Sequence, residues 1–260
     1  MPASVTRLDL RLRRRSAVGY AAGLALYTLT VVALYPSFRH SSSLDSLSGS
    51  TAAALLGVTG KLTSPGGWLN GNIYGNFLPL VLLLLAVGYG AASIAGNDED
   101  GTLSLVAALP LTRRSIVLQK AAAMALQVVL LAGAVAVCVL IGRGFQLDVG
   151  ASNAIGIAVA ASLMAMDFGL VTMAVGAATG RRGTAIGAGA SLAFASYLVS
   201  SLAATIPAIR PGRYVSLFYW SVGNDQISTG VSLTSYAILI AVGLAALAAA
   251  ILTFQRADLN

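Results

Sequence analysis

The sequence contains little charge. Only 10% of its 260 residues are Asp, Glu, Lys or Arg, whereas 57% are hydrophobic. Water-soluble domains carry about 25% charged residues, so a compact fold of this composition would have too little polar surface to stay dissolved. The shortage of charge therefore excludes a water-soluble globular protein and indicates a chain embedded in lipid.

Residues that often carry catalytic or metal chemistry are also scarce. The single cysteine, Cys138, excludes an intrachain disulfide and lies in an apolar run, where a small packing residue is expected. His40 is the only histidine, and the H-E-x-x-H, paired-cysteine and G-x-S-x-G patterns do not occur. The Gly-Lys pair at 60–61 resembles the end of a phosphate-binding loop, but Leu55 replaces the first Gly and Leu62 the Ser or Thr. We therefore expect no enzymatic activity and no bound cofactor or metal.

Long apolar runs take the place of charge. An α-helix needs about 20 residues to cross a hydrocarbon core of about 30 Å. Six runs are long enough, at residues 16–35, 77–95, 121–141, 155–179, 184–206 and 235–254. The sequence therefore predicts an all-α, polytopic membrane protein with six transmembrane helices. A shorter apolar run at 52–58 is expected in a loop or at the membrane interface.

Lys and Arg concentrate in alternate connections between these runs. Eleven of the sixteen basic residues fall in segments 1–15, 96–120, 180–183 and 255–260, which lie on one side of the membrane in a six-span topology. Because cytoplasmic loops carry an excess of Lys and Arg, we expect both termini in the cytoplasm and the chain in a plasma membrane, such as a bacterial inner membrane. The net charge of +7 then reflects topology, and no nucleic-acid partner is expected.

The basic segment 1–15 has two interpretations. Leu8 and Leu12 are spaced for one face of an amphipathic helix on the cytoplasmic membrane surface, or the segment is a basic flank that only sets topology. The first apolar run exceeds the 7–15 residues of a signal peptide, and no A-x-A-like site follows it at Tyr35, so we expect a retained anchor.

The connection at 96–120 breaks the apolar pattern. Asp98, Glu99 and Asp100 directly follow the second run, and Pro110 precedes a basic stretch. Asp100 can cap a short helix that ends at the proline. The apolar face of that helix would consist of Leu103, Val106 and Leu109. Such a face needs a cover, which could be the rest of the bundle, the lipid interface or a groove on a soluble partner.

The same connection resembles the first cytoplasmic loop of type-2 ATP-binding-cassette (ABC) transporter permeases. The matching positions are Glu99, Gly101, Thr102, Leu103, Leu109, Pro110, Arg113, Arg114, Ile116, Val117, Leu118 and Lys120. The Ser-Pro-Gly-Gly-Trp-Leu-Asn segment at 64–70 also resembles members of this family. Ser104 and Gln119 depart from the pattern, because many members have an acid and a glycine at those positions.

This resemblance implies a permease subunit that is not itself an ATPase. Two permease copies, as a homodimer or heterodimer, would form the pathway of an exporter, and separate cytoplasmic subunits would bind ATP and Mg. A short coupling helix between spans 2 and 3 would dock on the ATP-binding subunit. The docking residues would be Asp98, Glu99, Asp100, Gly101, Thr102, Leu103, Val106, Leu109, Pro110, Arg113, Arg114 and Lys120. Taken singly, each charge is more typical of a solvated loop residue or, for the arginines, of positive-inside topology, whereas the loop as a unit favours docking.

Asp167 lies near the middle of the fourth apolar run. A carboxylate at this depth is costly and is expected to face the interior of the bundle. It could line the substrate pathway or serve as the proton-relay acid of a self-contained, ion-coupled secondary transporter. It could also form a structural hydrogen bond, or lie near the interface in a shifted helix. A membrane scaffold or immunity protein is a further, non-transport alternative, and no motif indicates a substrate.

Aromatic residues gather in the external segment 207–220. They could form an interfacial aromatic belt; the family resemblance instead implies a re-entrant hairpin that gates the exit. The gate residues would be Arg210, Pro211, Tyr214, Phe218, Tyr219 and Trp220. Three glycine pairs with G-x-x-x-G spacing fit close helix crossings, at 19/23, 176/180 and 183/187.

Overall fold

The computed structural model describes residues 4–41, 61–96, 99 and 112–256, and within these ranges every regular element is helical. The elements are α1 (Ser4–Phe38), α4 (Pro65–Leu69), the π-helical turn η1 (Asn70–Tyr74), α5 (Phe77–Ala91), the π-helical turn η2 (Ala92–Gly96), α8 (Arg113–Ile141), the 3-10 turn η3 (Gly142–Phe145), α9 (Ala151–Thr179), α10 (Arg182–Thr205), the 3-10 segment η4 (Pro207–Val215), α11 (Leu217–Ser221), α12 (Gln226–Thr229) and α13 (Leu233–Arg256). Six stretches of helix are long and apolar enough to cross a membrane. The predicted all-α architecture with six spans is confirmed.

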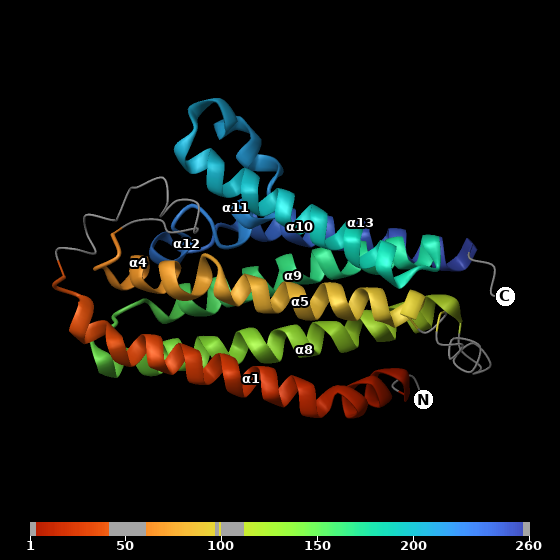
Figure 1. The fold of residues 1–260 in the computed structure, drawn as a ribbon, viewed down its shortest axis with the longest axis horizontal. Coiled ribbons are helices and arrows are strands. Elements are labelled where there is room, and N and C mark those ends of the chain that lie inside the picture. Colours follow the sequence, from red (N-terminus) through yellow and green to blue (C-terminus); the bar gives the residue numbers. More distant parts are fainter. Residues whose placement is uncertain (1–3, 42–60, 97–98, 100–111, 257–260) are drawn as a thin grey trace.

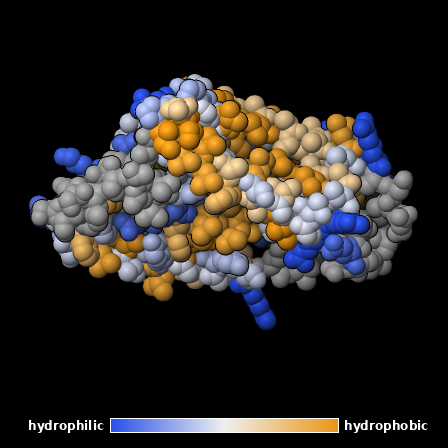
Figure 2. All heavy atoms as spheres, turned by 45° about the horizontal axis from the view of Figure 1, so that its top comes forward, coloured by the Kyte–Doolittle hydropathy of each residue, from blue (hydrophilic) through white to orange (hydrophobic). Residues whose placement is uncertain are grey.

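The long helices run along the longest axis of the molecule (Figure 1). α9 is central and contacts α5, α8, α10 and α13, whereas α1 packs mainly on α8. α10 diverges from the other helices and carries η4 away from the bundle (Figure 1). Hydrophobic side chains cover much of the middle of the face shown in Figure 2, with hydrophilic residues toward its ends, as a lipid-facing surface requires.

The two ends of the bundle differ. The N- and C-terminal ends of the described chain lie together with the ends of η2 and α8 that lead to residues 97–111 (Figure 1). We call this the loop end. The opposite end, which we call the far end, carries α4, η4 and α12.

Among the α-helices, α1 and α8 extend farthest beyond the apolar runs that predicted them. α1 continues unbroken through the basic segment, and at 1.5 Å per residue it is about 50 Å long. Pro36 lies inside its last turn, after which the Arg39 amide still donates to the carbonyl oxygen of Tyr35 at 3.1 Å. α8 begins at Arg113, ahead of the apolar run that starts at 121, because Ile116 and Val117 are buried and extend the packed face.

Small residues bring the central helices together. A Cβ atom on Gly90 of α5 would collide with the carbonyl oxygen of Gly169 on α9, and a Cβ on Gly169 would lie 2.6 Å from the sulfur of Met124. The backbones of α5 and α9 therefore approach each other where neither has a side chain. By contrast, Cβ atoms at the glycine pairs 19/23 and 183/187 would meet nothing within 4 Å. Those pairs do not mark crossings within the described chain.

The segment at 64–70 fastens the far end to α1. The Ser64 hydroxyl accepts a hydrogen bond from the Gly67 amide at 3.1 Å and thereby caps α4. Trp68 Nε1 donates to the carbonyl oxygen of Val31 at 2.9 Å, and its ring stacks on Phe38 at 5.6 Å between centroids. The Ser-Pro-Gly-Gly-Trp sequence thus makes a capped turn that docks its tryptophan on the first span.

Candidate functional site

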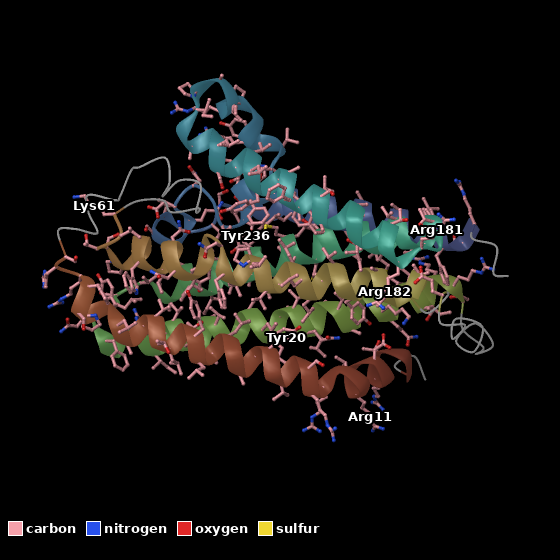
Figure 3. The ribbon with its side chains drawn as sticks, in the orientation of Figure 1. Arg11, Tyr20, Lys61, Arg181, Arg182 and Tyr236 are labelled. Atoms are coloured by element: carbon pink, nitrogen blue, oxygen red, sulfur yellow. The ribbon has the colours of Figure 1, made fainter. Side chains whose placement is uncertain are left out.

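The candidate site is the predicted docking loop at 96–120, and its first contact lies at the junction between η2 and α10. Glu99 Oε1 accepts a hydrogen bond from the backbone amide of Arg182 at 2.8 Å. Arg182 is the first residue of α10, where unpaired amides and the helix dipole favour a negative charge. Arg181 and Arg182 lie at the loop end in Figure 3. Glu99 therefore caps α10 from the segment that leads into residues 100–111.

Arg113 binds the C-terminal end of α13, as Glu99 binds the N-terminal end of α10. Its Nη1 donates to the carbonyl oxygens of Phe254 and Gln255, each at 3.2 Å, and its guanidinium lies 5.9 Å from the centroid of the Phe254 ring. The last carbonyls of a helix lack intrahelical partners and carry partial negative charge, so a cation stabilises them. The residue before it, Thr112, caps α8 by accepting from the Ser115 amide at 3.2 Å.

Lys120 makes the third contact of the docking loop, in the interior of the protein. Its side chain is 3% exposed, and its Nζ lies 3.4 Å from Asp9 Oδ2, with the Asp9 side chain 17% exposed. The Tyr89 hydroxyl donates to the same oxygen at 2.5 Å. One carboxylate oxygen thus joins α1, α5 and α8. The Thr6 hydroxyl adds a bond to the carbonyl oxygen of Gln119 at 3.0 Å, which fixes the start of α1 on α8.

These contacts place three predicted docking residues against the protein itself. Glu99 contacts α10, Arg113 contacts α13, and Lys120 contacts α1. Arg114 is exposed and is the remaining predicted docking residue that the structure describes. The short coupling helix and its other residues lie outside the described ranges, namely Asp98, Asp100, Gly101, Thr102, Leu103, Val106, Leu109 and Pro110.

Asp9 and Tyr89 are parts of the site that sequence reasoning missed. Asp9 is the only acid among the first 15 residues, which contain five arginines, and that isolation was the available signal. Tyr89 gave none, because a tyrosine near the end of an apolar run is ordinary at a membrane interface.

Asp167 is buried within the bundle, at 1% exposure. It faces α13, where a Cβ atom on Gly243 would lie only 2.7 Å from Asp167 Oδ1. Oδ2 has no hydrogen-bond partner among the described residues. Asp167 lies on neither wall of the two cavities described below, and no described Lys, Arg or His forms an ion pair with it.

An apolar groove of about 600 Å³ lies between α5 and α10 on the side of the bundle. Its walls are Asn76, Leu80, Leu83, Leu84, Val87 and Gly88 on one side, Ile186, Ala190, Ala193, Phe194 and Tyr197 on the other, and Phe218. A second cavity of about 270 Å³ lies toward the far end and includes Ser200, Ser201, Arg213 and Asp225. Tyr197 and Phe218 belong to both walls, so the apolar groove continues into a more polar cavity.

The aromatic segment at 207–220 folds back onto this path. Phe218 is buried, with its ring 5.3 Å from Tyr197 and 6.3 Å from Phe168. Tyr214 and Tyr219 enclose the guanidinium of Arg213 at 4.8 and 5.1 Å from their ring centroids. The hydrogen bond from Arg213 to the Tyr214 hydroxyl, 2.7 Å long, raises the pKa of the guanidinium.

The predicted gate residues therefore divide into two groups. Tyr214, Tyr219 and Trp220 form one ring cluster with centroid separations of 5.1 to 5.9 Å, next to the buried Phe218. Arg210 and Pro211 are exposed on η4.

Comparison with known proteins agrees with the loop motif and the six spans. A comparison with curated proteins gives no match. A family model described as ABC-2 family transporter protein matches residues 3–259, which is nearly the whole chain. The chain therefore belongs to the ABC-2 transporter family, as the multi-pass membrane permease subunit of an ABC transporter, a subunit that associates with an ATPase and is not itself one.

Proposed function

We propose that this permease pairs with a second permease copy to form the pathway of an ATP-driven exporter and docks the ATPase through the 96–120 loop. The observation that carries the proposal is the set of three contacts at the ends of that loop. Glu99, Arg113 and Lys120 bond the loop to α10, α13 and α1. If an ATPase displaced the loop, these bonds would therefore transmit the movement to the ends of the helices.

α10 links the loop to the pathway. Glu99 holds its first residue at the loop end, while Ile186, Phe194 and neighbouring side chains line the groove. Movement of α10 relative to α5 would change the width of this groove. Since the groove opens on the side of the bundle, a second copy that presents the same face would close it into a channel.

The route toward the far end supports the direction of export. Substrate would leave the apolar groove past Tyr197 and Phe218 and enter the more polar cavity, which Tyr219 of the aromatic cluster also lines. With the loop end in the cytoplasm, this route leads outward. ATP and Mg would bind to the partner ATPase, and this chain would supply the pathway and the docking loop.

The rival mechanism, a secondary transporter coupled through Asp167, has less support from the geometry. An acid that couples ion flow to transport must meet the ion and the pathway, whereas Asp167 faces Gly243 of α13 and lies off the groove. Transport of substrate by the reconstituted permease alone, driven by a proton gradient, would establish the rival.

The docking claim is tested by coexpressing the tagged permease with an ABC-type ATPase from the same genome. Leu103→Asp/Leu109→Asp places charge on the apolar face of the predicted coupling helix and is expected to abolish copurification. Ser104→Asp/Ala108→Asp places two charges on the opposite face, by helical spacing, and is expected to retain it. Both variants should insert normally. Retained copurification of Leu103→Asp/Leu109→Asp would contradict docking through this loop.

A further inference from the structure

The start of α1 carries a stripe of arginines. Arg7, Arg11, Arg14 and Arg15 are exposed, and their spacing of four, three and one residues puts them on one face of the helix. Among the described residues, none of the four has an ion pair or a hydrogen bond. Four adjacent guanidinium groups without a counter-charge repel each other, so this surface favours an anionic ligand.

The opposite side of the same helix is held in place. Asp9 lies two positions from Arg7 and Arg11, and therefore on another face, where it bonds to Lys120 and Tyr89. Thr6 bonds to the backbone of α8. Rotation of α1 is therefore restrained, and the arginine stripe is directed outward. Figure 3 shows Arg11 pointing away from the bundle.

The stripe also has a defined depth in the membrane. α1 continues without a break from Arg15 into the apolar run, so the arginines follow the axis of the span. From Arg7 to Arg15 the helix rises about 12 Å, and the headgroup region is about 5–8 Å thick on each side of the hydrocarbon core. Arg11, Arg14 and Arg15 thus lie at headgroup level, and the long Arg7 side chain can reach it.

We propose that this stripe is a binding site for anionic phospholipids of the leaflet at the loop end. A guanidinium pairs with phosphate through two parallel hydrogen bonds, and each basic residue near an anionic membrane contributes about 1 kcal/mol. A soluble partner would meet the end of the bundle, whereas the stripe lies along its side, where headgroups surround it. The proposal depends on membrane insertion and not on the transport mechanism.

The test uses the full-length permease in detergent and native mass spectrometry to count bound phosphatidylglycerol during a titration. Arg7→Gln/Arg11→Gln removes half of the stripe and leaves the basic residues next to the span, which preserves topology. We expect its affinity for phosphatidylglycerol to fall at least about fivefold, the equivalent of 1 kcal/mol. Arg7→Lys/Arg11→Lys keeps the charge and should lose less.

Two comparisons make the result specific. Arg143→Gln/Arg210→Gln removes two exposed arginines at the far end and should leave phosphatidylglycerol binding unchanged. Phosphatidylcholine should bind wild type and Arg7→Gln/Arg11→Gln equally. The proposal is overturned if Arg7→Gln/Arg11→Gln binds phosphatidylglycerol as wild type does, or loses both lipids alike. Loss of ATPase copurification with unchanged phosphatidylglycerol binding would also overturn it, in favour of a protein partner.

Discussion

Lys120 and Asp9 lie 111 positions apart in the sequence and form a largely buried ion pair, with Nζ 3.4 Å from Oδ2 and the side chains 3% and 17% exposed. The pair closes the contact between α1 and α8, and the Tyr89 hydroxyl ties α5 to the same oxygen. A buried ion pair adds little net stability over a well-packed apolar replacement, but removal of one partner leaves a buried charge and is costly. The energetic role of the pair is therefore visible in single substitutions.

Lys120→Met should destabilise the protein by about 3 kcal/mol, because the Asp9 carboxylate loses its counter-charge while it remains largely buried. Reversible unfolding in detergent with increasing dodecyl sulfate measures this change. Lys61→Met is the matched control, since Lys61 is the only other lysine and is exposed at the far end (Figure 3). Asp9→Asn/Lys120→Met should recover part of the loss, and additive losses would show that the two residues do not interact.

Arg113→Gln should loosen the end of α13. The substitution removes two hydrogen bonds to the Phe254 and Gln255 carbonyls and a cation at the negative end of the helix dipole, a local loss of about 1–2 kcal/mol. Hydrogen–deuterium exchange should become faster in the last turns of α13 and stay unchanged in α9. Arg114→Gln alters the exposed neighbour and should have no such effect, and equal protection in both variants would refute the anchor.

Gly243→Ala should disturb the contact between α9 and α13 at Asp167. The added methyl group would lie 2.7 Å from Asp167 Oδ1, so this buried side chain must shift; overpacking of this kind costs about 1–3 kcal/mol, whereas Ala gains about 1 kcal/mol over Gly within a helix. Gly187→Ala is the control, because a Cβ at that position meets nothing within 4 Å. Thermal unfolding in detergent should show a lower midpoint for Gly243→Ala alone. An equal shift of the unfolding midpoint in both variants would mean that the Asp167 side chain does not pack against Gly243.

A second copy against the α5–α10 face can be detected by cysteine cross-linking in membranes. Cys138, the only native cysteine, is buried, and Cys138→Ala provides the background. Phe194→Cys places a thiol on the groove side of α10, where the side chain is 62% exposed, and should form a covalent dimer on oxidation. Leu26 of α1 is at least as exposed, at 70%, and Leu26→Cys should not form a dimer. A dimer through Leu26→Cys instead would place the second copy elsewhere.

The number of spans followed from composition, because a lipid environment demands long apolar runs and a helix satisfies its own backbone. The sequence predicted the ends of the helices less well. Both α1 and α8 continue through polar residues because one face of each still packs on the protein. At the start of α8, Ile116 and Val117 are buried. At the start of α1, Thr6 bonds to the backbone of α8. A hydropathy pattern detects the apolar core of a span and does not detect a helix that leaves the membrane while still packed on its neighbour.

The loop residues show the same division. Sequence reasoning selected Glu99, Arg113 and Lys120 as charges that meet a partner, and the structure gives each a contact within the chain. The local sequence could not distinguish these outcomes, since a charge near a turn is compatible with solvent, with a partner or with the end of another helix. Only the folded positions of α10, α13 and α1 bring a helix terminus or Asp9 within bonding distance.

The sequence by itself determined the membrane class, the six spans and, through the loop motif, the transporter family, because these depend on residue type and short-range spacing. The tertiary structure alone decided which charges are paired, that Gly90 and Gly169 mark a close crossing, and that the groove between α5 and α10 leads to a more polar cavity. Each of these depends on residues far apart in the chain, whose distance is set by how the helices pack and not by the pattern along any one of them.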